Sequence, residues 1–326
     1  MGIGMETGDK IYVAGDRGLV GSAITRRLAA AGYTNLIGRS RHALDLTDQQ
    51  AVRAFFEAER PDHVFMCAAK VGGIRANNSY PADFIHLNQQ IQTNVIDAAW
   101  RSGVRKFLFM GSSCIYPRDC PQPIKEEYLL TGPLEVTNEG YAIAKIAGLK
   151  TCMALRQQYG FDAISVLPAN LYGPGDNFDL DHAHVIPALI RRFHTAKENG
   201  DRHVTVWGSG TARREFLFVD DLADASIFVM NHYTGAQHLN VGSGKDLPIA
   251  DLARLIAEIV GFEGEIVQDP SMPDGTPRKR LDSSRLRDLG WTPSVDLRTG
   301  LTRTYAWFLD NRTRLREGRG HALSHG

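Results

Sequence analysis

The chain has 326 residues, equal numbers of basic and acidic side chains, and 43% hydrophobic residues. This length is sufficient for one large α/β domain or for two lobes with a sizeable core. The zero net charge gives no reason to expect a nucleic acid or an anionic membrane as a partner. No apolar run approaches the roughly 18 residues that span a bilayer, and Met1–Gly8 lacks the charged and apolar regions of a secretory signal.

The cysteines are few and scattered. Cys67, Cys114, Cys120 and Cys152 form no C-x-x-C pair. In a chain of this length that pattern favours a reducing compartment over a disulfide framework. We therefore expect a soluble, cytoplasmic protein.

The first predicted strand leads directly into a glycine-rich turn. Lys10–Ala14 is a short apolar run, and Gly15, Gly18 and Gly21 follow it. Val20, Ile24 and Leu28 then recur at four-residue spacing, which is typical of a helix with one buried stripe. Glycines between a strand and a helix allow a tight turn and bring backbone N–H groups close to a pyrophosphate at the helix N-terminus. The context predicts a dinucleotide site.

The second strand, Asn35–Ile37, should end near the adenosine ribose of such a cofactor. An acidic residue at this place accepts hydrogen bonds from the ribose hydroxyls and disfavours a 2′-phosphate. The sequence has Arg39 and Arg41 instead, with no carboxylate until Asp45. Two guanidiniums suit a phosphate, so we expect NADPH rather than NADH. The alternative is that one or both arginines are solvated surface charge.

Helical and strand patterns continue to alternate through the first half. The expected order is a helix at Gln49–Arg60, a strand at His63–Cys67, a helix at Pro81–Trp100, a strand at Lys106–Met110, a helix ending near Tyr159 and a strand at Ala163–Leu167. This rhythm predicts βαβ units in an α/β fold, a Rossmann doubly wound parallel sheet. Ligands then bind beyond the carboxyl ends of the strands, where Ser112, Cys114 and Asn170 fall.

The second half is less regular and predicts a smaller C-terminal substrate-binding α/β lobe. Short strands are expected near Val204–Trp207, Glu215–Phe218 and His238–Val241. Helices are expected near His184–Lys197, Asp221–Met230, Ile249–Val260 and Leu297–Asn311. We expect an NADP-binding Rossmann domain at 9–170 with returning segments around 215–242, a mainly substrate-binding lobe at 171–312, and a flexible tail at 313–326.

One pair of motifs carries the chemistry. Tyr141 and Lys145 lie one helical turn apart on the same helix face, where an ammonium should favour the phenolate and lower the tyrosine pKa. Ser112, just past the strand at Lys106–Met110, can share a substrate oxygen with that phenol. These groups are suited to moving a proton on and off a carbonyl oxygen while a hydride arrives at carbon. The Tyr-x-x-x-Lys pattern alone is weak, and the upstream glycine turn gives it weight.

Together these residues resemble the extended short-chain dehydrogenase/reductase family over nearly the whole chain. Within that family the likeness is to members that epimerise and reduce GDP-4-keto-6-deoxy-D-mannose. The strings that carry this likeness are Ala69–Ile74, Gly111–Pro117, His184–Phe193, Trp207–Thr211, Arg214–Phe216 and Pro273–Lys279.

The resemblance implies epimerisation at C3 and C5 followed by reduction of the C4 ketone, with Ser112, Tyr141 and Lys145 serving the reduction. It makes Cys114 the base and His184 the acid of the epimerisations. Both groups titrate near enough to neutrality to serve after modest pKa shifts. The structural alternatives are a small buried thiol for Cys114 and a surface residue for His184.

The resemblance also implies ligand contacts and a homodimer. The expected cofactor contacts are Gly15, Arg17, Gly18, Leu19, Val20, Gly21, Arg39, Arg41, Lys145, Pro168, Asn170, Leu171 and His184. The expected substrate contacts are Arg192, Trp207, Arg214 and Lys279, with Arg213 as an alternative to Arg214. The helices at Asp83–Trp100 and Tyr141–Tyr159 resemble the pair that forms the dimer interface in this family.

Rival functions have weaker support. The nearest rival is a 4,6-dehydratase or a UDP-sugar 4-epimerase of the same family that uses retained NAD, and Arg39 and Arg41 argue against retained NAD. A dehydratase also usually has an Asp-Glu pair beside the catalytic hydroxyl, where this chain has Ser113 and Cys114. A cofactor-sensing scaffold would have no use for Ser112, Tyr141 and Lys145 together. A metal site is not expected, because His182 and His184 lack a third ligand at suitable spacing.

Overall fold

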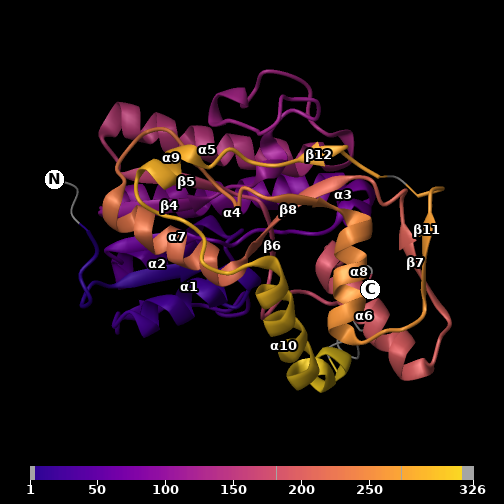
Figure 1. Ribbon diagram of the computed structural model, residues 1–326. Coiled ribbons are helices and arrows are strands. Elements are labelled where there is room, and N and C mark those ends of the chain that lie inside the picture. Colours follow the sequence, from indigo (N-terminus) through magenta and orange to yellow (C-terminus); the bar gives the residue numbers. More distant parts are fainter. Residues whose placement is uncertain (1–3, 181, 273, 318–326) are drawn as a thin grey trace.

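A parallel sheet of six strands forms the centre of the larger lobe in this computed structural model, which describes residues 4–180, 182–272 and 274–317 (Figure 1). The strand order is β2-β1-β3-β4-β5-β9. These strands are β1 Ile11–Ala14, β2 Leu36–Ile37, β3 His63–Met66, β4 Lys106–Met110, β5 Ala163–Pro168 and β9 Leu239–Val241. Every pairing among them is parallel. This confirms the predicted doubly wound fold, whose order reverses between β1 and β3 and so opens a ligand crevice there.

Helices cover both faces of this sheet. Helix α1 packs against α7, and α4 packs against both α2 and α5. Their bounds are α1 Leu19–Ala30, α2 Gln49–Glu59, α4 Pro81–Arg101, α5 Glu139–Tyr159 and α7 Val219–His232. Local chemistry sets the ends: Asp48 accepts a hydrogen bond from the Ala51 amide at 3.0 Å at the start of α2, and Gly160 ends α5 in a left-handed conformation.

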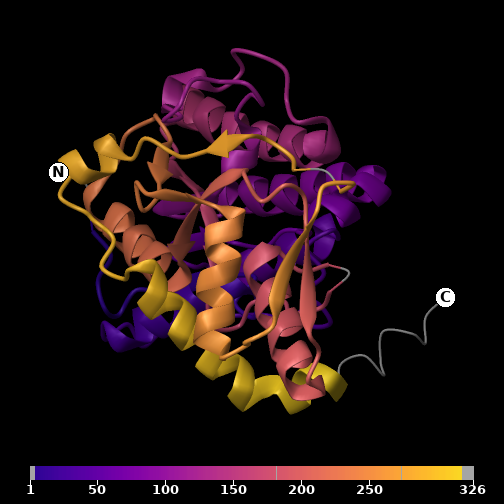
Figure 2. The same ribbon diagram turned by 45° about the vertical axis from the view of Figure 1, so that its right-hand side comes forward.

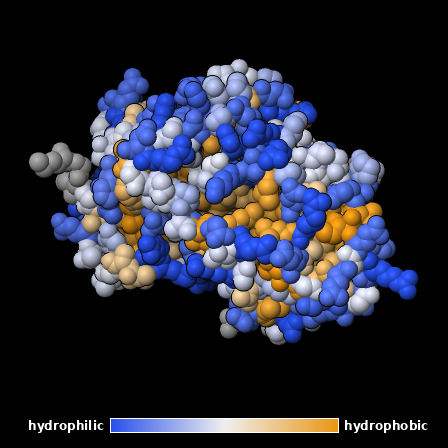
Figure 3. Space-filling view, in the orientation of Figure 1, coloured by the Kyte–Doolittle hydropathy of each residue, from blue (hydrophilic) through white to orange (hydrophobic). Residues whose placement is uncertain are grey.

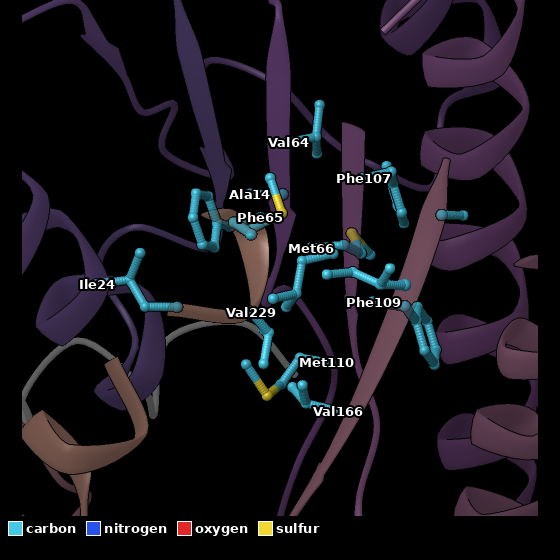
Figure 4. Packing of buried hydrophobic residues seen from close by; sticks show 14 of the residues in the cluster. Ala14, Ile24, Val64, Phe65, Met66, Phe107, Phe109, Met110, Val166 and Val229 are labelled. Carbon is cyan, nitrogen blue, oxygen red and sulfur yellow. The ribbon is translucent and has the colours of Figure 1, made fainter. Parts of the chain in front are cut away.

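The core of the larger lobe lies between the sheet and these helices. Figure 4 shows Ile24 of α1 and Val229 of α7 next to side chains of the central strands. Strands β1, β3, β4 and β5 are buried along their whole length. Parallel strands covered on both faces are expected to be buried in this way. The burial fixes the carboxyl ends of β1, β4 and β5, where the functional residues follow.

The smaller lobe is built on strand β8, Arg213–Phe218. Strands β6 Asn170–Tyr172, β10 Asp246–Pro248 and β12 Arg278–Lys279 pair with β8, while β7 His203–Trp207 pairs with β11 Glu265–Asp269. A second apolar cluster joins α6 Val185–Asn199 and α8 Ile249–Val260 to these strands. Helix α10, Leu297–Glu317, packs along α8 and β8 (Figure 2).

The predicted elements are present with small shifts in their ends. The largest shift is in α10, which continues to Glu317 rather than ending near Asn311, so 313–317 is helical; residues 318–326 lie outside the described part. Short elements without a clear periodicity were not predicted. These are α3 Ile74–Ser79, α9 Ser284–Asp288, strands β6, β10, β11 and β12, and the 3-10 turns η1 Ser113–Ile115, η2 Glu126–Tyr128 and η3 Val136–Asn138.

The surface is mainly hydrophilic on the face seen in Figure 1, with apolar side chains gathered between the two lobes (Figure 3). Within the described ranges, no helix has the length and apolar character needed to cross a membrane.

Candidate active site

The turn between β1 and α1 has the geometry of a dinucleotide-binding turn. Gly15 has a φ of +84°, and a Cβ there would lie 2.9 Å from backbone atoms of Ala68. A Cβ on Gly21 would lie 2.1 Å from the Gly15 carbonyl oxygen. Gly18 precedes α1 without a side chain to cap it, and the first turn of α1 has no acidic residue. The amides of this helix start can therefore face an anion, which fits a pyrophosphate.

The two arginines expected at the adenosine phosphate both follow β2. The Arg39 Nη2 atom lies 2.5 Å from Glu59 Oε1, and its Cζ atom lies 5.5 Å from the centroid of the Phe55 ring. Arg41 is exposed, and its charge adds to the hydrogen bonds from Thr47 that lower the pKa of Asp45. Arg39 is thus already paired with a carboxylate, and Arg41 is the less committed cation.

Ser112 and Cys114 lie just beyond the carboxyl end of β4. Ser112 precedes the turn η1, and its Oγ accepts a hydrogen bond from the Cys114 backbone N–H at 3.2 Å. Gly111 packs closely against β5, because a Cβ there would lie 2.1 Å from Leu167 Cδ2 and 3.1 Å from the Val166 carbonyl oxygen. Both side chains are half-buried. The hydroxyl and the thiol therefore occupy one small site.

Tyr141 and Lys145 reach the same end of β4 from α5. Lys145 is buried, and its Nζ donates a hydrogen bond to the Met110 carbonyl at 2.9 Å. The Nζ atom lies 6.0 Å from the centroid of the Tyr141 ring. Burial lowers the pKa of Lys145 to about 8, opposed by the charge of Cys67. A hydrogen bond with the Ser112 side chain lowers the pKa of the Tyr141 phenol. Ser112, Tyr141 and Lys145 therefore lie close together at the end of β4.

The expected direction of the tyrosine pKa was wrong. Burial raises the pKa of Tyr141, the negative charge of Cys114 raises it further, and the hydrogen bond at Ser112 opposes both. Lys145 directs its ammonium at the Met110 carbonyl instead of the phenol, so it does not offset the desolvation. The phenol therefore keeps its proton at neutral pH, which is the state that a proton donor needs.

Cys114 differs from the other three thiols. Its Sγ atom lies 3.3 Å from Lys279 Nζ. Burial alone would raise the pKa of Cys114, but the charge of Lys279, hydrogen bonds at Ser112 and Lys279, and the charge of Arg214 together lower it. Burial raises the pKa values of Cys67, Cys120 and Cys152. Cys114 is therefore the thiol whose surroundings favour a thiolate.

His184 lies at the start of α6 and shares a cation with Cys114. Its side chain is accessible to solvent, yet desolvation by the surrounding protein lowers its pKa, and the charge of Lys279 adds to this. The charge of Lys279 thus acts on both Cys114 and His184. The loop before α6 is joined to the loop before α3, since the Gly73 backbone N–H donates to the carbonyl of His182 at 3.3 Å.

The two candidate arginines occupy successive positions on β8 and have different partners. The Arg213 Nη2 atom lies 3.3 Å from an oxygen of Asp246, whereas Arg214 donates from Nη2 to the Asp274 carbonyl at 3.1 Å. The charge of Arg214 also acts on Cys114. Successive strand residues point to opposite faces, so Arg214 faces the site and Arg213 does not.

Arg192 and Trp207 form the wall of a separate recess. The Arg192 Cζ atom lies 4.8 Å from the Trp207 ring centroid, and Nη1 donates to the Thr205 carbonyl at 3.3 Å. Trp207 is 44% exposed, which is unusual for so large an aromatic side chain. The recess has a volume of about 360 Å³ and is lined by Leu180, Arg192, Thr195, Ala196, Asp201, His203, Val204, Thr205 and Trp207. This volume is in the range of small-molecule sites.

The remaining predicted cofactor residues lie at the turn after β1 and at the β5–β6 junction. Arg17 is in the turn, and Leu19 and Val20 begin α1. Pro168 ends β5, while Asn170 and Leu171 begin β6. The Asn170 side-chain amide donates to the Glu215 carbonyl at 3.0 Å, so β8 holds this junction in place.

Sequence reasoning missed Asp274. Its carboxylate accepts hydrogen bonds from the backbone N–H and the hydroxyl of Ser209, both at 2.8 Å. It thereby joins the loop after β7 to the loop before β12, next to Arg214. The neighbouring Pro273 of the predicted motif lies outside the described residues. The string Pro273–Lys279 contains Asp274, but neither the string nor the Asp-Gly turn signal at Asp274–Gly275 carries information on partners distant in sequence.

Comparison with known proteins shows which family the chain resembles. Residues 11–242 match the NAD dependent epimerase/dehydratase family. The chain is 60% identical over 307 residues to the probable GDP-L-fucose synthase 1 of Oryza sativa subsp. japonica, covering 94% of each chain. It is 54% identical over 316 residues to the GDP-L-fucose synthase of Escherichia coli K12, covering 94% of this chain and 98% of that one.

A solved structure with a similar fold also matches the chain. The GDP-L-fucose synthetase of Naegleria fowleri bound to NADP superimposes with a TM-score of 0.88 at 28% identity, over 95% of this chain and 97% of that one.

Proposed function

Because this chain belongs to the NAD dependent epimerase/dehydratase family, we propose that it converts GDP-4-keto-6-deoxy-D-mannose to GDP-L-fucose, by epimerisation at C3 and C5 and then reduction at C4 with NADPH. The observation that carries this function is the identity of 54–60% to proteins named GDP-L-fucose synthase over 94% of this chain. The grouping of a phenol, a hydroxyl, a low-pKa thiol and an imidazole supports it.

The three reactions can share one oxygen-binding device. A 4-keto group acidifies the C–H bonds at C3 and C5, because loss of either proton gives an enolate. We assign Ser112 and Tyr141 to the C4 oxygen, where two donors stabilise the developing negative charge as an oxyanion hole does. The raised pKa of Tyr141 supports this assignment, since the phenol remains protonated.

Epimerisation needs a base on one face of the sugar ring and an acid on the other. We assign Cys114 as the base and His184 as the acid. The lowered pKa of Cys114 supports the first role. The lowered pKa of His184 makes its imidazolium a stronger acid. Because the keto group lies between C3 and C5, turning the sugar once could present both carbons to the same pair.

Reduction uses the same phenol. Bound NADPH supplies the hydride for C4, and Tyr141 gives its proton to the C4 oxygen. The nearby buried Lys145 is assigned to the nicotinamide ribose. We place the pyrophosphate against the turn at Gly15–Gly21 and the 2′-phosphate near Arg39 and Arg41. The pairing of Arg39 with Glu59 favours Arg41 as the main phosphate contact.

The GDP part of the substrate is assigned to the smaller lobe. Arg192 and Trp207 offer a cation and an aromatic face for the base or phosphates, and Arg214 offers a second cation nearer to Cys114. We propose that residues 9–170, with the returning segment 215–242, mainly bind NADPH, and that 171–312 mainly bind the GDP-sugar.

A homodimer is part of the proposal. Helices α4 and α5 pack against each other and leave Ile143 39% and Tyr159 54% exposed, while Trp100 stacks on Tyr159 with ring centroids 4.5 Å apart. A second copy of this helix pair would cover these side chains. Light scattering after size exclusion should give a dimer that Ile143→Glu weakens; a wild-type monomer at micromolar concentration would overturn this part.

A cytoplasmic location is also proposed, and cell fractionation tests it.

One reaction tests the function. Purified protein is mixed with NADPH and GDP-4-keto-6-deoxy-D-mannose in D2O, and the fall in absorbance of the reduced nicotinamide is followed. We expect GDP-L-fucose carrying deuterium at C3 and C5, identified by NMR. A reduced sugar without deuterium at these positions would indicate a simple C4 reductase. No consumption of NADPH would refute the proposal.

A further inference from the structure

Strand β12 brings a cation from late in the chain to the proposed epimerisation base. Lys279 pairs in register with Arg214 on β8. Its Nζ atom lies 3.3 Å from Cys114 Sγ, although 165 positions separate the two residues in sequence. Lys279 is half-buried, and within the described ranges it forms no ion pair with a carboxylate. Its ammonium is therefore directed at the thiol.

The groups around Cys114 come from five elements, and they favour a negative charge there. The cations are Lys279 of β12 and Arg214 of β8. The neutral groups are Ser112 beside η1 and the protonated phenol of Tyr141 on α5. His184 at the start of α6 also lies within electrostatic reach of Lys279. The carboxylates of Asp274 and Glu135 act on Arg214, so Lys279 is the cation most fully committed to the sulfur.

We propose that Lys279 is a positioning residue that holds Cys114 as a thiolate, ready to remove the protons at C3 and C5. This rests on the proposed function and adds a role for Lys279 beyond binding the substrate. In each epimerisation the C–H proton passes to Sγ, and the C–H electron pair becomes the enolate, with its charge on the C4 oxygen. His184 then gives a proton to the same carbon from the opposite face. Before the second round the thiol gives its proton to water, and the neutral imidazole of His184 takes one up from water, so both groups return to their starting states.

The proposal can be tested without substrate or NADPH. Native protein is pulsed with iodoacetamide between pH 5.5 and 10, and alkylation of the Cys114 peptide is measured by mass spectrometry. The reagent is uncharged, so its rate reports the thiolate fraction rather than attraction of the reagent. We expect the midpoint in the wild type to lie below that of an ordinary cysteine. Lys279→Met should raise the midpoint by at least about one pH unit, and thus slow alkylation about tenfold or more at pH values below the wild-type midpoint.

Control variants separate charge from structure. Lys279→Arg keeps a cation and should restore a low midpoint. Arg278→Met removes the neighbouring charge of β12, which is paired with Asp246, and should leave the midpoint unchanged. Lys279→Gln is a second neutral replacement should Lys279→Met lose its native circular dichroism. A wild-type midpoint in either folded neutral variant overturns the proposal.

Deuterium exchange separates this inference from the proposed function. If the wild type puts deuterium at C3 and C5, Lys279→Met should lower the exchange rate at saturating substrate and move its pH profile to higher pH. A residue that only binds substrate would raise KM and leave the profile in place, which would refute the role in activation. If the wild type incorporates no deuterium, the proposed function fails, while the alkylation result still decides whether Lys279 sets the state of Cys114.

Discussion

Replacing Gly21 by alanine sets two physical effects of opposite sign against each other. Gly21 lies inside α1, where alanine should be more stable than glycine by about 0.5–1 kcal/mol through helix propensity. The new Cβ would lie 2.1 Å from the Gly15 carbonyl oxygen, 2.6 Å from its carbon and 2.9 Å from the Asp16 nitrogen. Carbon contacts are comfortable at about 3.5 Å, so the helix and the turn must separate by more than about 1 Å.

The clash should win because backbone atoms cannot rotate away as a side chain can. Gly15 is held by its own close approach to Ala68. Overpacking costs about 1–3 kcal/mol where side chains can adjust, and we expect at least the upper end here. The net loss is then about 2 kcal/mol or more. The unfolding entropy for 326 residues is about 0.7 kcal/mol per degree, so Tm should fall by at least about 3 °C.

Gly18→Ala is the matched control in the same turn. Its Cβ would meet the Gly15 carbonyl oxygen at 3.5 Å, an ordinary contact, and its φ of −79° suits alanine. Thermal unfolding by circular dichroism without cofactor should give a small change for Gly18→Ala and a clear loss for Gly21→Ala. Adding NADPH should raise the Tm of the wild type by mass action but not that of Gly21→Ala. An unchanged or higher Tm for Gly21→Ala would show that the turn is looser than described, and the argument for a tight pyrophosphate turn would be refuted.

Three further predictions concern single groups. Tyr141→Phe should slow NADPH oxidation by about 10²-fold or more, the scale of general acid catalysis, with NADPH affinity measured by calorimetry unchanged; near-normal turnover would exclude the phenol as donor. Arg41→Ala should reduce the ratio of kcat/KM for NADPH to that for NADH by more than Arg39→Ala does, and an NADH preference in the wild type would contradict the assignment of both arginines. Burial raises the pKa of Asp176 from 3.8 to about 7, so the folded protein keeps a proton that the unfolded chain releases between these values. Stability should therefore fall as pH rises across this window, by up to about 1.4 kcal/mol per unit. Urea midpoints of Asp176→Asn should not show this fall, and identical pH profiles of mutant and wild type would count against the burial argument.

The sequence by itself determined the features that depend on neighbours along the chain. The alternation of apolar strands and striped helices specified a parallel doubly wound sheet, because side-chain period and crossover handedness are local properties of the backbone. The glycine turn before α1 and the one-turn spacing of Tyr141 and Lys145 were readable for the same reason.

The tertiary structure decided the contacts and pKa values that depend on residues far apart in the sequence. Lys279 reaches Cys114 only because β12 pairs with β8. The tertiary structure also decides which face of β8 borders the site, and hence that Arg214 rather than Arg213 faces it. The pKa of Tyr141 moved against expectation, because burial raises it and Lys145 directs its ammonium at the Met110 carbonyl rather than at the phenol. Electrostatic energies depend on distance and burial in three dimensions, and no spacing in the sequence encodes either for residues from separate elements.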